Sequence, residues 1–346
     1  MKFYLSLLFL SLTQLVLGQQ PYYDDVNLTL TGEALYTELQ TKISNASSTF
    51  DYADARDALL FTDENPSNSS QVLLIYGYND SDGSCTTDRT RSKSLFGGME
   101  CEYNREHVFA RSNADPTMGS VDNSTTGIGA DPHNLRASDQ QMNNNKGNRR
   151  FGDSSGNAGV IGGGNWYPGD EWKGDVARMM MYMYTRYGDR CLPALMGTGP
   201  TQGSTDMLQL FLQWNVEDPV SFYEDQRNDY LETAYGNRNP FIDNPVLATI
   251  IWGGDTAEDR WGLLATATFT ADAFALYPNP NTSGQLNIST SLDIDSVKIY
   301  SVTGQLLLEA HQFQGEILDV SKLSSGLYLV QITEAEKQLV KRLIIR

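Results

Sequence analysis

Positive charge is scarce in this sequence. Its 346 residues include 25 Lys and Arg against 43 Asp and Glu, which gives a formal net charge of -18 at pH 7. A chain this acidic does not attract DNA or a membrane surface through its overall charge. Disorder is not indicated either, because apolar residues make up 40% of the chain and aromatic residues 10%, which is ordinary for a globular protein.

Long apolar runs are absent beyond the N-terminus. Lys2 is followed by a mainly apolar run at 3–17 and by Gly18, and a polar, acidic segment comes next. The run is shorter than the roughly 20 residues that a membrane-spanning helix needs. We therefore expect residues 1–18 to be a secretory signal peptide, with a retained membrane anchor as the alternative. The length of the remaining chain favours two folded units.

Histidine and cysteine are also few, with three of each in the chain. His107 and His133 together with the scattered cysteines do not have the ligand spacing of a tetrahedral zinc site. In an exported chain, cysteines can form lasting disulfides. We expect Cys85 to pair with Cys101 across a short Gly- and Ser-rich loop, and a bridge from Cys101 to Cys191 remains the alternative.

Residues 25–253 have the pattern of a mixed α and β domain in which helices are the majority. Helical spacing begins at Thr31 and continues to residue 39, and the apolar run at 72–76 predicts a strand. Residues 173–187 are apolar nearly all round and contain four Met, which is typical of a buried helix. Two further helices are expected, at 208–214 and 219–235.

The pattern changes after residue 253. We expect a linker at 254–275 and a second domain at 276–346, where short alternating segments are separated by turns that contain Gly. This spacing predicts a small all-β sandwich. The expected strands are 285–290, 296–300, 305–309, 327–333 and 337–345. Because His311 is the only imidazole there, we expect no catalysis in this domain.

The polar stretch at 101–152 carries the strongest chemical signal. It contains the adjacent pair Glu106 and His107, the sequence D-P-H-N-L at 131–135, and Asn143. Hydrolysis of a phosphodiester needs an activated water and a partner for the charge on the departing oxygen, which a hard divalent cation held by oxygen ligands provides. Glu106 and Asn143 offer a carboxylate and an amide oxygen. The His107 imidazole can accept the proton of water near neutral pH.

The same stretch predicts a hairpin followed by a helix. Residues 106–109 and 133–135 form the expected hairpin, joined by a Gly- and Asn-rich loop. A capping box begins at Ser138, so a helix is expected to start there and to carry Asn143 in its second turn. A regular strand points adjacent residues to opposite faces. We therefore expect a bend at the Glu-His pair at 106–107, or else a metal and a base that approach the phosphate from different sides.

These motifs resemble those of the endonuclease I family. Its ββα-metal site uses E-H on the first strand, D-x-H-N-L on the second, and an Asn-containing stretch on the helix. The resemblance covers about residues 30–253 and implies an α+β fold, with a ββα-metal nuclease core embedded in a mainly helical domain. It implies that Glu106 and Asn143 are metal ligands and that His107 is the general base. Lys146 stands where the family usually has Arg.

The resemblance implies an extracellular endonuclease that cleaves without sequence specificity and leaves 5'-phosphates. DNA is the expected substrate, RNA is a second candidate, and the expected cofactor is one Mg²⁺ ion, with Mn²⁺ or Ca²⁺ as alternatives. The competing hypothesis is an inactive, surface-displayed binding or adhesion protein on the same fold, against which the intact set of site residues argues. Six more residues are candidates to support the ligands or to bind phosphate: Arg105, His133, Asn134, Lys146, Asn148 and Arg149.

Charges cancel within the stretch that carries these motifs. Residues 101–150 contain six Arg and Lys and six Asp and Glu, so the net charge of -18 belongs to the rest of the chain. The candidate site is therefore relatively positive within an acidic protein. We expect its Arg and Lys side chains to contact phosphates, and we expect substrate affinity to fall as salt is raised.

The last part of the chain resembles the type A C-terminal sorting domain of proteins exported by type IX secretion. The matching segments are Y-P-N-P at 277–280, V-K-I-Y at 297–300, G-L-Y at 326–328 and a basic, apolar ending at 341–346. The resemblance implies contact with the secretion machinery and a secreted protein, either extracellular or at the cell surface. A carbohydrate-binding sandwich is the competing interpretation, but no exposed aromatic platform supports it. We expect a monomer without a stable membrane span.

Overall fold

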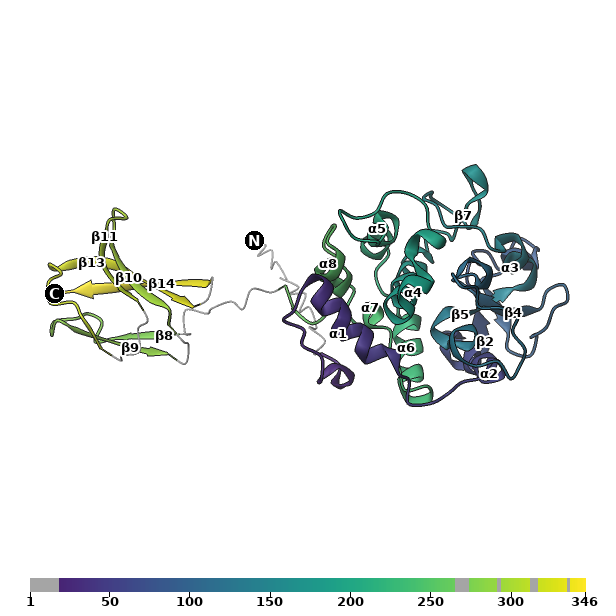
Figure 1. Cartoon of the computed structure of the whole chain (residues 1–346). Coiled ribbons are helices and arrows are strands. Elements are labelled where there is room, and N and C mark those ends of the chain that lie inside the picture. The colour runs from purple at the N-terminus through teal and green to yellow at the C-terminus, as the bar shows by residue number, and fades with distance from the viewer. Residues whose placement is uncertain (1–18, 265–273, 291–293, 312–316, 335–336) are drawn as a thin grey trace, which may run out of the picture. The chain divides into compact units, whose positions relative to one another are not determined.

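The computed structural model describes residues 19–264, 274–290, 294–311, 317–334 and 337–346. The chain divides into two compact units, Met1–Leu263 and Leu264–Arg346, whose elements are drawn in Figure 1. The first unit is mixed α and β, and the second is built from β-strands in its described part. The signal peptide expected at 1–18 lies outside the described residues, as does the part of the expected linker at 265–273.

Helices form most of the first unit. They are α1 (Gly32–Ser44), α2 (Tyr52–Thr62), α3 (Gln140–Lys146), α4 (Lys173–Tyr187), α5 (Gln209–Glu217), α6 (Phe222–Ala234), α7 (Pro240–Asp243) and α8 (Val246–Trp252). Short antiparallel strands lie between them: β1 (Glu64–Asn65), β2 (Asn68–Leu73), β3 (Thr90–Ser92), β4 (Tyr103–His107), β5 (Leu135–Asp139), β6 (Gly159–Val160) and β7 (Trp166–Tyr167). They pair as β1-β2-β3, β4-β5 and β6-β7. Among the described residues, no helix is long and apolar enough to cross a membrane.

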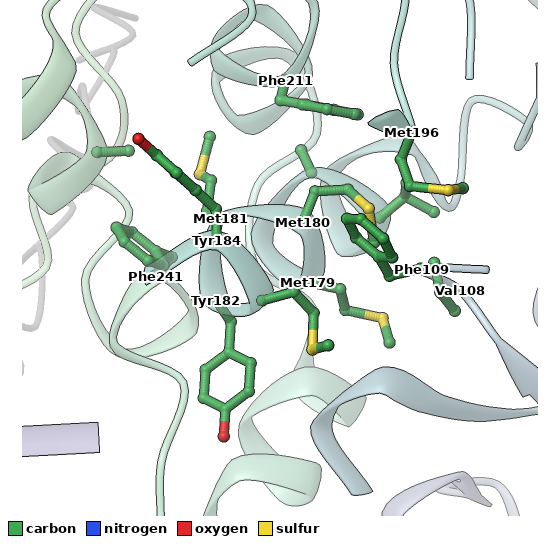
Figure 2. Close-up of a cluster of buried hydrophobic side chains, with 14 of the residues drawn as sticks. Val108, Phe109, Met179, Met180, Met181, Tyr182, Tyr184, Met196, Phe211 and Phe241 are labelled. Carbon is green, nitrogen blue, oxygen red and sulfur yellow. The ribbon is translucent and has the colours of Figure 1, made fainter. Parts of the chain in front are cut away.

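Helix α4 lies at the centre of the hydrophobic core of this unit. It has the predicted bounds, and every residue from 174 to 185 is buried. Its Met side chains pack with Val108, Phe109 and Phe211 in the cluster that Figure 2 shows, where the flexible thioether fills irregular gaps. Val108 and Phe109 directly follow β4. The packing against α4 therefore fixes the end of that strand.

The N-terminal helices form where the sequence predicts helix. Helix α1 follows Thr31 as expected and continues to Ser44, although the Thr31 side chain makes no capping hydrogen bond. Helix α2 begins at Tyr52 because Asp51 caps it. The Asp51 carboxylate accepts hydrogen bonds from the backbone of Ala53 and Asp54, and the Asp54 carboxylate accepts one from the Asp51 amide. This reciprocal capping box fixes the place of Tyr52 at the start of the helix.

Two other expectations for this unit differ in their bounds. The strand expected at 72–76 is β2, which begins earlier, because the polar residues from Asn68 onward pair with β1 and β3. Residues 74–76 are fully buried but lie outside the strand. The helices expected at 208–214 and 219–235 are α5 and α6, and α6 begins after Ser221, which forms a capping box with Glu224.

The predicted hairpin and helix are present as β4, β5 and α3. Strands β4 and β5 are antiparallel, with Tyr103 opposite Asp139 and His107 opposite Leu135. The expected helix start at Ser138 is wrong, because Ser138 is still in β5 and Asp139 is the N-cap. The Asp139 carboxylate accepts hydrogen bonds from the amides of Gln141 and Met142, and an ionised acceptor caps a helix more strongly than a hydroxyl.

The second unit consists of two packed sheets in its described part. Its strands are β8 (Phe274–Tyr277), β9 (Gln285–Thr290), β10 (Ser296–Ser301), β11 (Leu306–His311), β12 (Ile317–Asp319), β13 (Gly326–Glu334) and β14 (Lys337–Ile345). One sheet has the order β11-β10-β13-β14 and the other β12-β9-β8. Side chains from both sheets, such as Ile288 and Val330, share one buried cluster. All five predicted strands are present, whereas the short β8 and β12 were not predicted.

Candidate active site

A cleft of about 560 Å³ opens at the end of β4. Glu106 and His107 from β4 line it together with Asn143 from α3. The three residues that the sequence singled out therefore share one cavity. Tyr52 from α2 and Arg111 from the loop after β4 also line it. Both acidic and basic atoms thus face a single water-accessible space.

Glu106 is held from behind by two buried side chains. Its carboxylate oxygen Oε1 lies 3.1 Å from the Lys146 ammonium and accepts a hydrogen bond of 3.3 Å from the Tyr76 hydroxyl. Glu106 is only 3% exposed, and burial raises its pKa while the Lys146 charge lowers it. Both contacts are made to Oε1. Within the described part of the chain, the other oxygen, Oε2, is therefore left for a ligand in the cleft.

Asn143 presents its amide oxygen in a defined orientation. Its Nδ2 group donates hydrogen bonds to Asn104 Oδ1 at 2.7 Å and to the Arg105 carbonyl at 3.3 Å. A carbonyl can only accept, so the amide nitrogen must face Arg105 and the amide oxygen must face away from it. Asn143 sits in the middle of α3, whose start is fixed by Asp139.

These donors fit a hard divalent cation. A carboxylate oxygen and an amide oxygen that line the same cleft are ligands that Mg²⁺ and Ca²⁺ prefer, with water completing the shell. A second group of ligand-type atoms, from Cys85, Glu100 and Cys101, also lies close together. Its two sulfur atoms are bonded to each other, so no thiolate is available there and that group is not a metal site.

His107 has a fixed tautomer. Its Nε2 lies 2.8 Å from the carbonyl oxygen of Gly129, and because a carbonyl accepts only, Nε2 carries the hydrogen and Nδ1 carries the free lone pair. The ring is 8% exposed, and burial lowers its pKa to about 3. The Tyr52 ring stacks on the imidazole, with 5.4 Å between centroids. The site therefore holds a neutral imidazole that can accept a proton at Nδ1.

The adjacent positions of Glu106 and His107 do not separate them into different cavities. His107 is the last residue of β4 and the last one paired with β5. Beyond it, the amides of Val108 and Phe109 donate to the backbone and side-chain oxygens of Asn134. The chain thus leaves the ladder immediately after the pair, where both side chains reach the same cleft.

The six supporting candidates fall into different places. Arg105 and Asn148 line the cleft. Lys146 is fully buried behind Glu106 and also donates to the Val108 carbonyl, so its charge contacts the carboxylate and not the solvent. Arg149 is exposed and lines a separate groove of about 350 Å³ that includes Trp166.

Asn134 and His133 are buried and do not line the cleft. The Asn134 side-chain amide accepts a hydrogen bond from the backbone N–H of Phe109 at 2.7 Å and donates one to the Phe109 carbonyl at 3.1 Å. These two bonds connect the chain after β4 to the turn before β5. His133 packs on Tyr182, with 4.4 Å between ring centroids, and its Nε2 lies 3.3 Å from the Asn237 carbonyl. Both residues support the hairpin.

The sequence did not single out Tyr52, Tyr76 or Gly129. Each reaches the site through a contact between segments that are distant in the chain, and no local pattern marks such a contact. Arg111 was noticed only as one of the basic residues in the motif stretch. Its guanidinium donates to the Gly119 carbonyl at 2.6 Å, which fixes the loop that closes one side of the cleft.

The expected disulfide is present and is linked to the site. Cys85 and Cys101 are bonded, and Cys191 is a buried free thiol. Arg91, which lies between the bridged cysteines in sequence, donates to the Cys85 carbonyl at 2.6 Å. Its other nitrogen lies 3.2 Å from Asp139, the N-cap of α3. The bridged loop therefore holds the helix that carries the amide ligand candidate.

Comparisons with known proteins agree with this geometry. Residues 31–246 match the family model described as Endonuclease I, and residues 275–346 match that of a secretion system C-terminal sorting domain. The chain is 39% identical over 237 residues to an extracellular ribonuclease of Bacillus subtilis (strain 168), which covers 64% of this chain and 75% of that protein. It is 38% identical over 236 residues to an extracellular ribonuclease of Bacillus amyloliquefaciens, covering 64% and 74%.

Proposed function

Since the chain belongs to the endonuclease I family, we propose that it hydrolyses phosphodiester bonds in both RNA and DNA, without reading sequence, by using one divalent metal ion. Membership of the family makes the chain a nuclease, and the sorting domain makes it a secreted or cell-surface protein. The observation that carries the finer proposal is the cleft shared by Glu106, His107 and Asn143. In this proposal β4, β5 and α3 form the ββα-metal core of the family.

Glu106 and Asn143 would hold the metal through Oε2 and Oδ1. Support comes from the contacts on their far sides, which leave those two oxygens without a donor in the described part of the chain. When bound, a divalent ion supplies Lewis acidity to the phosphate and stabilises charge on the departing oxygen. Burial raises the pKa of Glu106, and the Lys146 ammonium opposes that rise and holds the carboxylate in place before any ion binds. Mg²⁺ is the proposed ion, with Mn²⁺ and Ca²⁺ as alternatives.

His107 would act as the general base. Its Nδ1 accepts a proton from the attacking water, and the hydrogen on Nε2 remains bonded to the Gly129 carbonyl. That carbonyl then faces the positive charge that develops on the imidazole. The arrangement is that of a base oriented by a second acceptor. Tyr52 restrains the ring by stacking on it.

The proposed nucleophile is water, and the sugar hydroxyl takes no part. Attack by water does not require the 2'-hydroxyl that distinguishes RNA from DNA, so one site serves both polymers. Departure of the 3'-oxygen leaves a 5'-phosphate, as the family resemblance implies. Arg105, Arg111 and Asn148 line the cleft and would contact phosphate oxygens, which positions the strand without reading bases.

The test compares purified protein with two pairs of matched variants. Plasmid DNA and a single-stranded RNA are incubated with the unmutated protein in Mg²⁺ and in chelator, and with His107→Ala and Asn143→Ala in Mg²⁺. The controls are His311→Ala, an exposed imidazole in the second unit, and Asn144→Ala, the exposed neighbour on α3. Cleavage of both polymers, lost in chelator and in both site variants but kept in both controls, is expected.

Other outcomes would each reject a defined part of the proposal. Cleavage that persists in His107→Ala would reject the assigned base. Full activity in chelator would reject the metal. Cleavage of RNA alone would reject the claim that one site serves both polymers.

A further inference from the structure

A second, mostly apolar pocket of about 230 Å³ lies next to the Arg105 side chain. We call it the Phe96 pocket. Its inner wall contains the edge-to-face pair of Phe96 and Tyr103, whose ring centroids are 5.4 Å apart. The lining residues are Arg56, Asp57, Leu60, Lys93, Phe96 and Tyr103.

Arg105 connects this pocket to the catalytic cleft. Its guanidinium carbon lies 3.5 Å from the centroid of Tyr52, the ring that stacks on His107. The same carbon lies 5.6 Å from the centroid of Phe96. One cation therefore contacts an aromatic ring in the cleft and an aromatic ring in the pocket. Arg105 therefore lies between the cleft and the Phe96 pocket.

Further rings and cations lie at the rim of the pocket and beyond it. Arg56 lies 5.9 Å from the Phe96 centroid, on the pocket rim. Lys93 lies 5.7 Å from the centroid of Phe61, a side chain that is 50% exposed and stacks on Tyr230 with 9° between the rings. We call the series of rings and cations the aromatic track. It consists of Tyr52, Arg105, Phe96, Arg56, Lys93 and Phe61.

We propose that the aromatic track binds the bases and phosphates of an unpaired nucleic-acid strand that leads away from the cleft, so that this nuclease prefers single-stranded substrates. The inference rests on the proposed function and deepens it. Proteins that bind single strands combine a positive groove with aromatic rings on which bases stack. The track has both components, and its first ring, Tyr52, stacks on the proposed general base.

A duplex cannot use the track in the same way. Its bases are paired and stacked inside the helix, and extruding one costs a few kcal/mol. The apolar wall of Phe96 and Tyr103 offers nothing to a duplex surface, which presents sugar and phosphate. An unpaired strand exposes the faces of its bases at no such cost, so the pocket discriminates by strand state.

Two acidic residues partly offset the track's charge. Asp57 pairs with Arg56, and Glu64 pairs with Lys93. The Asp57 side chain is 63% exposed and that of Glu64 is 30% exposed, and solvent weakens the attraction within exposed pairs. Arg56 can therefore turn to a phosphate when a strand arrives, and Lys93 can attract one from within its pair with Glu64. Arg105 forms no salt bridge with the described residues; its guanidinium donates a hydrogen bond to the Tyr52 carbonyl and lies against the rings of Tyr52 and Phe96.

Binding is measured in chelator, where the substrate stays intact. Fluorescence anisotropy of a labelled 15-nucleotide single-stranded DNA is recorded with the unmutated protein, Phe96→Ala and Phe61→Ala. Each substitution is expected to weaken binding about tenfold, the size of one lost stacking contact. A hairpin duplex of the same sequence is expected to bind at least about tenfold more weakly than the single strand.

Three controls separate stacking from folding. Phe222→Ala removes an exposed phenylalanine that is 70% exposed on α6 and lies outside the track, and it should bind as the unmutated protein does. Phe96→Trp keeps an aromatic face and should restore binding. If Phe96→Ala unfolds, the double variant Arg56→Gln, Lys93→Gln tests whether a strand binds along the track. It should reduce the salt slope of single-strand binding by about 1.4, which corresponds to two phosphate contacts.

The outcomes distinguish this inference from the proposed function. Equal affinity for single strand and duplex, or equal binding by Phe96→Ala and Phe222→Ala, would overturn the track while leaving cleavage in the cleft intact. If the unmutated protein cleaves no nucleic acid in Mg²⁺, the proposed function itself fails, whatever the binding data show.

Discussion

At the scale of single residues, the buried ion pair of Lys146 and Glu106 holds the carboxylate that we propose as a metal ligand. Lys146 is fully buried, and its ammonium contacts Glu106 and the Val108 carbonyl. The family usually has Arg at this position, whose planar, forked group needs more space and more acceptors. A compact ammonium suits a site with one carboxylate oxygen and one carbonyl. We infer that the substitution is accommodated by this smaller acceptor set.

Loss of that ammonium should destabilise the fold. We expect Lys146→Met to lower the free energy of unfolding by about 3 kcal/mol, because it leaves a buried carboxylate without its partner. The measurement is urea unfolding in chelator. Lys173→Met is the control, since Lys173 pairs with the part-exposed Glu217, and it should cost less than about 1 kcal/mol. If both variants lose the same free energy of unfolding, the contact between Lys146 and Glu106 does not account for the loss.

A second buried group, His133, makes stability depend on pH. Burial lowers its pKa from 6.5 to about 3. Between these values the unfolded chain binds a proton that the folded chain does not, so stability rises with pH. The contribution is complete above pH 6.5 and is lost as pH falls toward 3. His133→Gln keeps a donor for the Asn237 carbonyl but has no imidazole to titrate. Its free energy of unfolding should therefore fall less steeply as pH decreases, by up to about 1.4 kcal/mol for each pH unit.

Urea midpoints of both proteins at pH 7 and at pH 5.5 provide the measurement for His133. The other titrating groups, including His107, are common to both proteins, so they cancel in the comparison. If the urea midpoint falls by the same amount between pH 7 and pH 5.5 in the unmutated protein and in His133→Gln, His133 is protonated in the folded state.

At the scale of elements, the placement of Asn143 depends on how α3 begins. Asp139 caps α3 and pairs with the buried Arg91, which in turn holds the disulfide-bridged loop. We expect Asp139→Ala to cost about 2 kcal/mol through the lost cap and to reduce cleavage by 10- to 100-fold, because a ligand displaced by about an ångström is badly placed for catalysis. Rates and urea midpoints are both recorded.

The matched control for this substitution is Ser221→Ala, which removes the N-cap of α6. It should lower stability by about 1 kcal/mol and leave the cleavage rate unchanged. Asp139→Asn keeps an oxygen acceptor for the cap and should recover part of the rate. If Ser221→Ala slows cleavage as much as Asp139→Ala does, the effect is general loosening of the fold.

The elements that were predictable from sequence are those with a strong local pattern. Helix α4 has the predicted bounds because it is buried on all sides and nothing interrupts it. The hairpin and α3 were expected from the order of the motifs, but the N-cap of α3 is Asp139 and not Ser138. Strand β12 spans three residues, too few for a period to show. Tyr52 and Gly129 reach the site only through tertiary contacts, which local patterns do not encode.

At the scale of the whole molecule, an acidic protein acts on a polyanion. The net charge of -18 repels nucleic acid at long range. Binding must therefore come from short-range contacts between cations and the substrate, as we propose for Arg105 and Arg111, which line the cleft. Stacking on aromatic rings is insensitive to net charge, which makes the aromatic track especially useful to a protein of this composition.

The two units should respond separately to the metal, because each has a hydrophobic core of its own residues. Calorimetry of the protein should show two unfolding transitions, and a chain of residues 19–264 should show only one of them. Mg²⁺ at about a hundredfold its dissociation constant stabilises a binding fold by about 2.7 kcal/mol, which raises the midpoint of a unit of this size by roughly 5 to 10 °C.

Only the transition of the first unit should move with Mg²⁺, and it should not move in Asn143→Ala. This readout is independent of cleavage, so it tests the ligand assignment without a substrate. A shift that survives in Asn143→Ala would place the ion elsewhere, for example on exposed carboxylates, which are abundant in this chain. A shift of both transitions would mean that Mg²⁺ acts through general charge screening, because the second unit contains none of the proposed ligands.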